Sequence, residues 1–463
     1  MCIPERLIAF VGIACGLAMA AKAAAPATVV IRDTTVVDVE KGSLLPSRTL
    51  VIVGDRIKSI RPSAERSAVP REVRTIDGRG KFVIPGLIDS HVHFESQLNH
   101  CNITGDEILP LFLACGVTTI RDAGDEIVAE KFVARYAAAH PESCPRIVLC
   151  SPLIDRIPQR YRDIGWGLPQ DPEKVPEFVD DMAGWGVATL KIWVGTERAV
   201  GRRLIDEGHR HGMVVIGHLA GNYSPVDAAN DGIDSLEHAG PESVYGLIAL
   251  RSGLHFTGNY ADSYDGEVNL NGPVADEVIA SLAKTKVMVD PTLVVFSSVS
   301  LADMPEISLD PDNLLMPARW QKYCLRWNRN YKPGSLERRK AQFKKYQELT
   351  GLLYRANIPL LAGSDGPYPF CPPPGFALQK ELRLLVESGL PPAAALQAAT
   401  IHAARCLKQD EDIGSIEEGK IADLVILNSN PLTDIKNARD ISLVVRGGLV
   451  CDPGSLLKQV PTN

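Results

Sequence analysis

The chain has 463 residues, of which 45% are apolar and 23% are charged, so it can form a large buried core and does not belong to the disordered or low-complexity classes. It carries 49 Lys and Arg against 56 Asp and Glu, a net charge of −7, and it has no basic run. Because phosphate binding needs clustered Lys and Arg, this charge pattern argues against nucleic acid as a partner.

The first residues have the pattern of an export signal. Arg6 supplies a positive charge, residues 7–21 are uncharged and mostly apolar, and residues 21–23 offer a small-x-small cleavage site. The apolar run is shorter than the roughly 20 residues of a membrane span, so we favour a cleaved signal at residues 1–23 over an uncleaved anchor or a lipid on Cys15. We therefore predict a periplasmic or secreted protein that has no membrane span after removal of the signal.

The rest of the chain divides into three parts by pattern. Short apolar runs broken by Gly and Asp fill residues 24–82 and predict a small antiparallel sheet, and a similar pattern returns in residues 412–463. Between them, over residues 83–411, strand-like runs alternate with helix-length segments, and eight such units close into a barrel. Because two half-sheets that flank a barrel most simply pair in space, we predict an α/β fold. It consists of a (β/α)8 TIM barrel and a composite small β-sandwich domain built from both ends of the mature chain.

The first candidate metal ligands are His91 and His93, which end an apolar run that begins at residue 84. Side chains alternate along a strand, so both imidazoles lie on one face, about 6.5–7 Å apart along the chain, and can reach one metal ion. The alternative is a pair of polar residues on an exposed strand face. The apolar residues before the pair indicate burial and favour the metal.

Lys191 lies in the middle of another apolar run, residues 188–194. Burial disfavours a charged amine, so such a lysine is either neutral, paired, or extended toward solvent from the strand end. A neutral lysine can react with carbon dioxide to form a carbamate, whose two oxygens can bridge two cations.

Three further polar residues follow apolar runs directly, namely His218, His238 and Asp365. Each of them alone is also compatible with a hydrogen-bonded core residue. Together with the previous three residues they lie at the carboxyl ends of the strands that we number one, four, five, six and eight. Enzymes with a TIM barrel keep their active sites at this end.

Several motifs along nearly the whole mature chain resemble those of the amidohydrolase superfamily, in particular the imidazolonepropionase-like branch that includes metal-dependent Xaa-Pro and Xaa-Arg/Lys dipeptidases. The motifs are residues 85–93 (PGLIDSHVH), 116–119 (GVTT), 237–238 (EH), 290–293 (DPTL), 363–365 (GSD) and 414–424 (GSIEEGKIADL).

The resemblance implies a site for two divalent metal ions. His91, His93 and Asp365 would hold the more buried ion, His218 and His238 would hold the other, and an N6-carboxylated Lys191 would bridge the two. Zinc suits these ligands best, and manganese, cobalt and iron stay open. A hydroxide between the ions would be the nucleophile, and Asp365 would be the catalytic residue that passes its proton to the leaving amine.

The chain differs from the deaminases of the superfamily, which usually carry a Glu shortly after the strand-five histidine and lack the strand-four lysine. Here His218 is followed by Leu219-Ala220-Gly221, and Lys191 is present. We therefore expect a binuclear hydrolase of an amide bond, and among such enzymes we favour a dipeptidase of the Xaa-Pro or Xaa-Arg type. The alternatives are hydrolysis of a cyclic amide, lactone or carbamate with the same metals, and metal-dependent binding without turnover.

We expect a small-molecule or dipeptide substrate in a pocket that is lined by Trp193, Tyr223 and Tyr368. The long segment 296–357 between strands seven and eight is typical of a lid or binding wall. A substrate carboxylate would need a cation, for which the sequence leaves Arg121, Arg326 and Arg329 open. The sequence also leaves a homo-oligomer open.

Cys101 follows strand one and Cys371 follows strand eight. These strands are neighbours in a closed barrel, and an exported protein folds in an oxidising compartment. We therefore predict a disulfide between these two cysteines.

Overall fold

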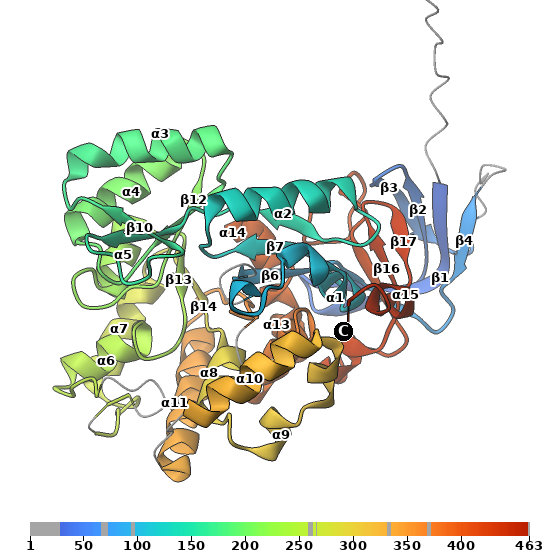
Figure 1. The fold of residues 1–463 in the computed structure, drawn as a ribbon. Coiled ribbons are helices and arrows are strands. Elements are labelled where there is room, and N and C mark those ends of the chain that lie inside the picture. Colours follow the sequence, from blue (N-terminus) through green and yellow to red (C-terminus); the bar gives the residue numbers. More distant parts are fainter. Residues whose placement is uncertain are drawn as a thin grey trace, which may run out of the picture.

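The structure is a computed structural model that describes residues 28–65, 73–93, 98–257, 263–264, 266–330, 335–367 and 372–461. A sheet of strands from both chain ends lies beside a larger part in which parallel strands alternate with helices (Figure 1). The predicted signal, Tyr368 and Cys371 lie outside the described residues. The predictions made for them, including the disulfide, therefore stay predictions.

One eight-stranded sheet unites the two ends of the chain. Its order is β17-β16-β15-β5-β1-β2-β3, with β4 paired to β1. Antiparallel pairing of β5 with β15 joins the ends and places Val83 opposite Ile426, both fully buried. The predicted pairing of the half-sheets is confirmed, whereas the two-layered sandwich stays a prediction. The strands are β1 (Thr28–Asp38), β2 (Ser43–Val53), β3 (Arg56–Pro62), β4 (Arg74–Asp77), β5 (Phe82–Pro85), β15 (Leu424–Leu427), β16 (Ile441–Arg446) and β17 (Leu449–Cys451).

The middle of the chain forms two parallel sheets, β6-β7-β8 and β10-β9-β11-β12-β13-β14. In the described part of the chain their ladders do not join into one continuous ring. Single parallel bridges connect β14 to Leu360 and Gly366 to β6, so the segment before and after Asp365 lies between the two sheets. The strands are β6 (Leu87–Val92), β7 (Val117–Asp122), β8 (Arg146–Val148), β9 (Leu153–Arg156), β10 (Gly165–Leu168), β11 (Thr189–Ile192), β12 (Val214–Gly217), β13 (Ser235–Glu237) and β14 (Met288–Asp290).

Helices cover the parallel strands from outside (Figure 1). In α4, a Cβ added at Gly208 would approach Leu190 and Val215 to 2.9 and 2.8 Å, so the glycine allows close packing onto β11 and β12. None of the helices within the described ranges is long and apolar enough to cross a membrane. The helices are α1 (Leu109–Ala114), α2 (Ile127–Ala139), α3 (Val175–Trp185), α4 (Arg198–Arg210), α5 (Pro225–Asp231), α6 (Val244–Arg251), α7 (Pro273–Ala283), α8 (Leu293–Ser300), α9 (Pro305–Ser308), α10 (Ala318–Asn330), α11 (Leu336–Arg355), α12 (Phe376–Glu387), α13 (Pro392–Ala398), α14 (Ile401–Cys406) and α15 (Pro453–Leu457).

The long segment between strands seven and eight, expected to be a lid or binding wall, contains the four helices α8 to α11. Its Trp320 belongs to the main hydrophobic core, and the Tyr323 ring lies 5.9 Å from the ring of His100, outside the segment. These aromatic side chains therefore pack the segment onto the rest of the protein.

Candidate metal centre

The six predicted ligands come from separate strands of the two parallel sheets and from the segment between them. His91 lies in β6 and His93 follows it, Lys191 lies in β11, and His218 and His238 directly follow β12 and β13. Asp365 adopts a left-handed backbone conformation with φ 52°, and its N–H donates to the carbonyl of His91 at 2.8 Å. This turn brings the carboxylate next to β6.

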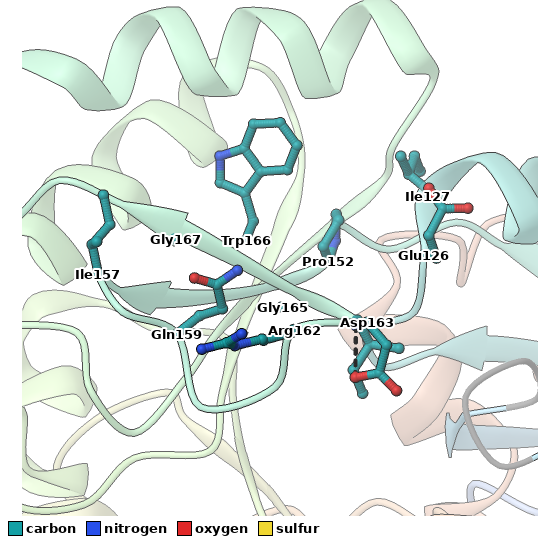
Figure 2. Close-up of a pocket in the computed structure, with 11 residues that line it drawn as sticks. Glu126, Ile127, Pro152, Ile157, Gln159, Arg162, Asp163, Gly165, Trp166 and Gly167 are labelled. Atoms are coloured by element: carbon teal, nitrogen blue, oxygen red, sulfur yellow. Dashed lines mark hydrogen bonds between the residues drawn. The ribbon is translucent and has the colours of Figure 1, made fainter. Parts of the chain in front are cut away.

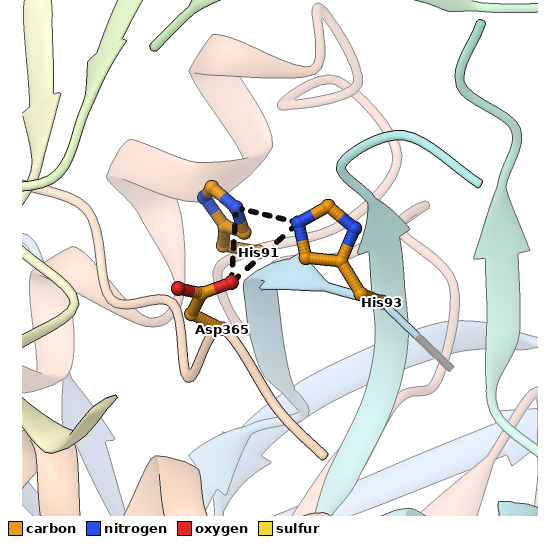
Figure 3. Close-up of side chains that lie close together, drawn as sticks. All are labelled: His91, His93 and Asp365. Carbon is orange, nitrogen blue, oxygen red and sulfur yellow. Dashed lines mark hydrogen bonds and ion pairs between the residues drawn. The ribbon is translucent and has the colours of Figure 1, made fainter. Parts of the chain in front are cut away.

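The side chains of these residues converge on one small volume. The Nε2 atoms of His91 and His93 are 3.2 Å apart, and each lies 3.5 Å from Oδ1 of Asp365 (Figure 3). Nζ of Lys191 lies 3.4 Å from Nε2 of His91. The rings of His218 and His238 are 4.3 Å apart, and the His238 ring is 4.8 Å from the His91 ring.

Three of the four histidines have one ring nitrogen in a hydrogen bond, which leaves the other nitrogen for a metal ion. Nδ1 of His91 donates to Oε2 of Glu237 at 2.5 Å, and Nδ1 of His93 donates to the carbonyl of Gly124 at 2.9 Å. Nδ1 of His238 is hydrogen-bonded to Oγ1 of Thr292 at 2.7 Å. These contacts fix the imidazoles as metal-binding proteins fix theirs, with the other nitrogen facing inward.

His218 supplies the strongest sign that a ligand belongs here. Its Nδ1 is buried and finds no hydrogen-bond partner among the described residues. A buried polar atom without a partner requires an explanation, and an ion beside the His238 ring would satisfy it. The donor set of imidazoles, a carboxylate and an amine-derived group fits a divalent transition metal.

Burial also gives the histidines and Lys191 the protonation states that metal binding needs, whereas it works against the anionic form of Asp365. It lowers the pKa of His93 to about 3 and holds the pKa values of the other three histidines well below the ordinary range, so all are neutral. Burial likewise lowers the pKa of Lys191, which favours the neutral amine, and raises the pKa of Asp365 to about 7.

A buried ion pair that the sequence analysis missed lies directly behind His91. Nη2 of Arg121 donates to both carboxylate oxygens of Glu237 at 3.0 and 3.1 Å, and all three residues are fully buried. Burial alone would raise the pKa of Glu237, but Arg121 and Lys191 hold it below its usual value. Glu237 is therefore an anion that accepts the His91 proton. The sequence feature that could have indicated this pair is the presence of two opposite charges, at residues 121 and 237, within apolar strands.

This pair corrects one proposal for substrate binding. Arg121 was a candidate for the cation that meets a substrate carboxylate, but its guanidinium is committed to Glu237 beneath the site. Arg326 is exposed on α10, and the side chain of Arg329 lies outside the described residues. Arg121 therefore contacts the candidate ligand His91 through Glu237 and is not available to a substrate carboxylate.

The two described aromatic candidates differ in position. The edge of the Trp193 ring lies against His218, with ring centroids 4.5 Å apart, so Trp193 borders the site. Tyr223 does not, and its assignment to the substrate pocket is wrong. Its ring packs against Gly201 of α4 and its hydroxyl donates to Asp231 at the end of α5. The cause is the direction of the loop after His218, which turns its aromatic ring toward the outer helices.

A separate cavity of about 460 Å³ lies beside β9 and β10 (Figure 2). Its lining includes Gln159, Arg162 and Trp166 and none of the six candidate ligands. The segment between the two strands forms part of its wall.

The model of the amidohydrolase family matches residues 82–304 and 345–451. The chain belongs to the amidohydrolase family. Among curated proteins, an adenine deaminase of Clostridium botulinum (strain Loch Maree / Type A3) is 21% identical over 440 residues, which are 94% of this chain and 59% of that protein. The chain thus spans about three fifths of the length of this relative.

Two solved structures share the fold over nearly their whole length. The first is a putative prolidase from Bifidobacterium longum, 25% identical with a TM-score of 0.69, covering 94% of this chain and 99% of that one. The second is an Xaa-Pro dipeptidase with bound methionine in the active site, 20% identical with a TM-score of 0.67, covering 92% and 100%. Family and neighbours together identify the TIM-barrel amidohydrolase fold, and they confirm the resemblance to an amidohydrolase superfamily with dipeptidase-like members.

Proposed function

We propose that this amidohydrolase is an exported dipeptidase that cleaves Xaa-Pro or Xaa-Arg dipeptides with two divalent ions, zinc being the first choice. The observation that carries the proposal is the convergence of four neutral imidazoles, a buried lysine and a carboxylate, with inward nitrogens that their other contacts leave available. The prolidase-like neighbours, which cover more than nine tenths of the chain, support a peptide substrate.

In this proposal His91, His93 and Asp365 would hold one ion, His218 and His238 would hold the other, and Lys191, as a carbamate, would bind both. When bound, the ions supply Lewis acidity that polarises a carbonyl and lowers the pKa of water. The residues of the chain orient the ligands, transfer the proton and exclude water.

Glu237 keeps the proton of His91 on Nδ1, and Gly124 does the same for His93, so both Nε2 atoms stay available. Asp365 lies within 3.9 Å of His238 and of both paired histidines, where its carboxylate receives a proton during attack and returns it to the leaving amine. Trp193 and Phe296 pack against His218 and His238 and exclude water from that side.

The distant adenine deaminases make deamination the principal competing activity. Two features of this chain favour peptide hydrolysis: Leu219-Ala220-Gly221 contains no acidic residue after His218, and Lys191 is fully buried beside His91. Deaminases of the superfamily generally differ at both places.

The test is a substrate panel offered to the zinc-loaded protein: Xaa-Pro and Xaa-Arg dipeptides, cyclic amides, lactones, carbamates and adenine. We expect release of free amino acids from the dipeptides and none from the metal-free protein. Ammonia from adenine without peptide cleavage would replace the proposal by a deaminase. Cleavage of ring substrates or carbamates alone would replace it by the second hydrolase, and full metal content without turnover would indicate a binding protein.

A further inference from the structure

An ion pair bridges two loops beside the candidate metal centre. Nη1 of Arg160 lies 3.1 and 3.2 Å from the two carboxylate oxygens of Glu242. The Arg160 side chain is 39% exposed and that of Glu242 17%, so the pair lies at the boundary between protein and solvent. Neither residue belongs to the six candidate ligands.

The order of the strands places this pair across the mouth of the site. Arg160 lies in the loop that follows β9, and Glu242 lies in the loop that follows β13, four residues after His238. Between β9 and β13 in the sheet are β11 and β12, whose carboxyl ends carry Lys191 and His218. Because the strands are parallel, both loops leave the same edge of the sheet, and the ion pair spans these two strands.

Side-chain contacts connect the Arg160 loop to the metal centre. The ring of Tyr161 lies 5.8 Å from the ring of Trp193, which in turn contacts His218. Gln159 and Arg162 of the same loop line the cavity of Figure 2. The loop thus contacts Trp193 through Tyr161 and lines the cavity through Gln159 and Arg162.

The backbone of this loop is held in place while the charged end of Arg160 remains accessible. The Asp155 carboxylate accepts hydrogen bonds from the backbone N–H of Arg156 and of Arg160, both at 2.8 Å. The Arg160 backbone is therefore held in place from β9. Because the Arg160 end of the pair is solvent-exposed, a ligand can reach it from the mouth of the site.

We propose that Arg160 and Glu242 bind the two opposite end charges of a zwitterionic substrate, Arg160 its carboxylate and Glu242 its ammonium group. This inference rests on the proposed function and names the feature of the substrate that is recognised. A guanidinium binds a carboxylate through two parallel hydrogen bonds. When the substrate binds, Arg160 and Glu242 exchange the contact between them for contacts with the carboxylate and the ammonium group of the substrate. Both residues therefore keep a partner of opposite charge, with and without the ligand.

The experiment compares four forms of one Xaa-Pro dipeptide: free, C-terminally amidated, N-acetylated and blocked at both ends. The variants are Arg160→Gln and Glu242→Gln, with Arg162→Gln as the matched control, since Arg162 lies on the same loop and lines the cavity. Arg160→Gln should lower kcat/KM about 10- to 100-fold for forms with a free carboxylate, the loss expected for one charge-assisted contact, and leave the amidated forms unchanged. Glu242→Gln should lower kcat/KM by a similar factor for the forms with a free amino end and leave the acetylated forms unchanged.

An equal loss with all four forms would overturn the proposal, because it would show a structural effect of the substitutions. Calorimetry with L-proline and L-prolinamide provides a measurement that does not depend on turnover. The metal-loaded protein should bind L-proline more tightly than L-prolinamide, and Arg160→Gln should abolish the difference. If no dipeptide is cleaved but this difference exists, the proposed function fails and the charge recognition stands. If dipeptides are cleaved but L-proline and its amide bind equally, the charge recognition fails alone.

Discussion

Glu237→Gln tests how the protein orients its first metal ligand. The substitution keeps the shape of the side chain but removes the charge that accepts the His91 proton at 2.5 Å and pairs with Arg121 at 3.0 and 3.1 Å. Loss of a partner that orients a ligating histidine typically weakens metal binding by about 10- to 100-fold, or about 1.4–2.8 kcal/mol. Removing the anion also leaves Arg121 buried without its charge partner, which costs about 3–5 kcal/mol of the free energy of unfolding.

The assay is chelator competition for zinc, with urea unfolding of the metal-free protein as a separate measurement. Glu381→Gln is the matched control, because Glu381 is equally buried but accepts from the backbone N–H groups of Leu293 and Val294 and contacts no histidine. We expect weaker zinc binding in Glu237→Gln and wild-type affinity in the control. A folded Glu237→Gln protein with wild-type zinc affinity would refute the orienting role.

Three further predictions concern other parts of the molecule. Lys191→Ala should reduce the bound zinc from two ions to one per chain by elemental analysis, and retention of two would exclude the carbamate bridge. Burial raises the pKa of Glu381 from 4.5 to about 8. Between these pH values the folded chain keeps a proton that the unfolded chain has lost, so the free energy of unfolding falls as the pH rises through this window. At about 1.4 kcal/mol per pKa unit the contribution is about 5 kcal/mol. Urea unfolding of metal-free Glu381→Gln should therefore show a flatter decline from pH 5 to pH 8 than the wild type, and an unchanged decline would contradict this assignment. Peptide mapping without reduction should find Cys101 joined to Cys371, and detection of both as thiols would disprove that disulfide.

The sequence predicted the position of the site because strands constrain side-chain direction. His91 and His93 share a face by the two-residue period, Lys191 lies within a buried apolar run, and His218 and His238 directly follow such runs. Their convergence in the structure needs only that these strands be parallel. The pairing of the chain ends was equally accessible, since each half-sheet exposes an edge that the other covers.

The rest depends on contacts between segments that are distant in sequence. The Arg121–Glu237 pair joins β7 to β13, and the Arg160–Glu242 pair joins two loops, so neither can be read from local spacing. Tyr223 was misplaced because five residues after His218 the chain has turned toward α4 and α5. The helices between strands seven and eight were not predicted, because a lid or binding wall was expected there from the length of the segment alone.

The most direct test of the account is anomalous diffraction from crystals of the zinc-loaded protein, measured above the zinc absorption edge. The account predicts two peaks, one beside His91, His93 and Asp365 and one beside His218 and His238, with density extending the Lys191 side chain between them. Peaks elsewhere, a single peak, or an unmodified Lys191 amine between two occupied sites would contradict it.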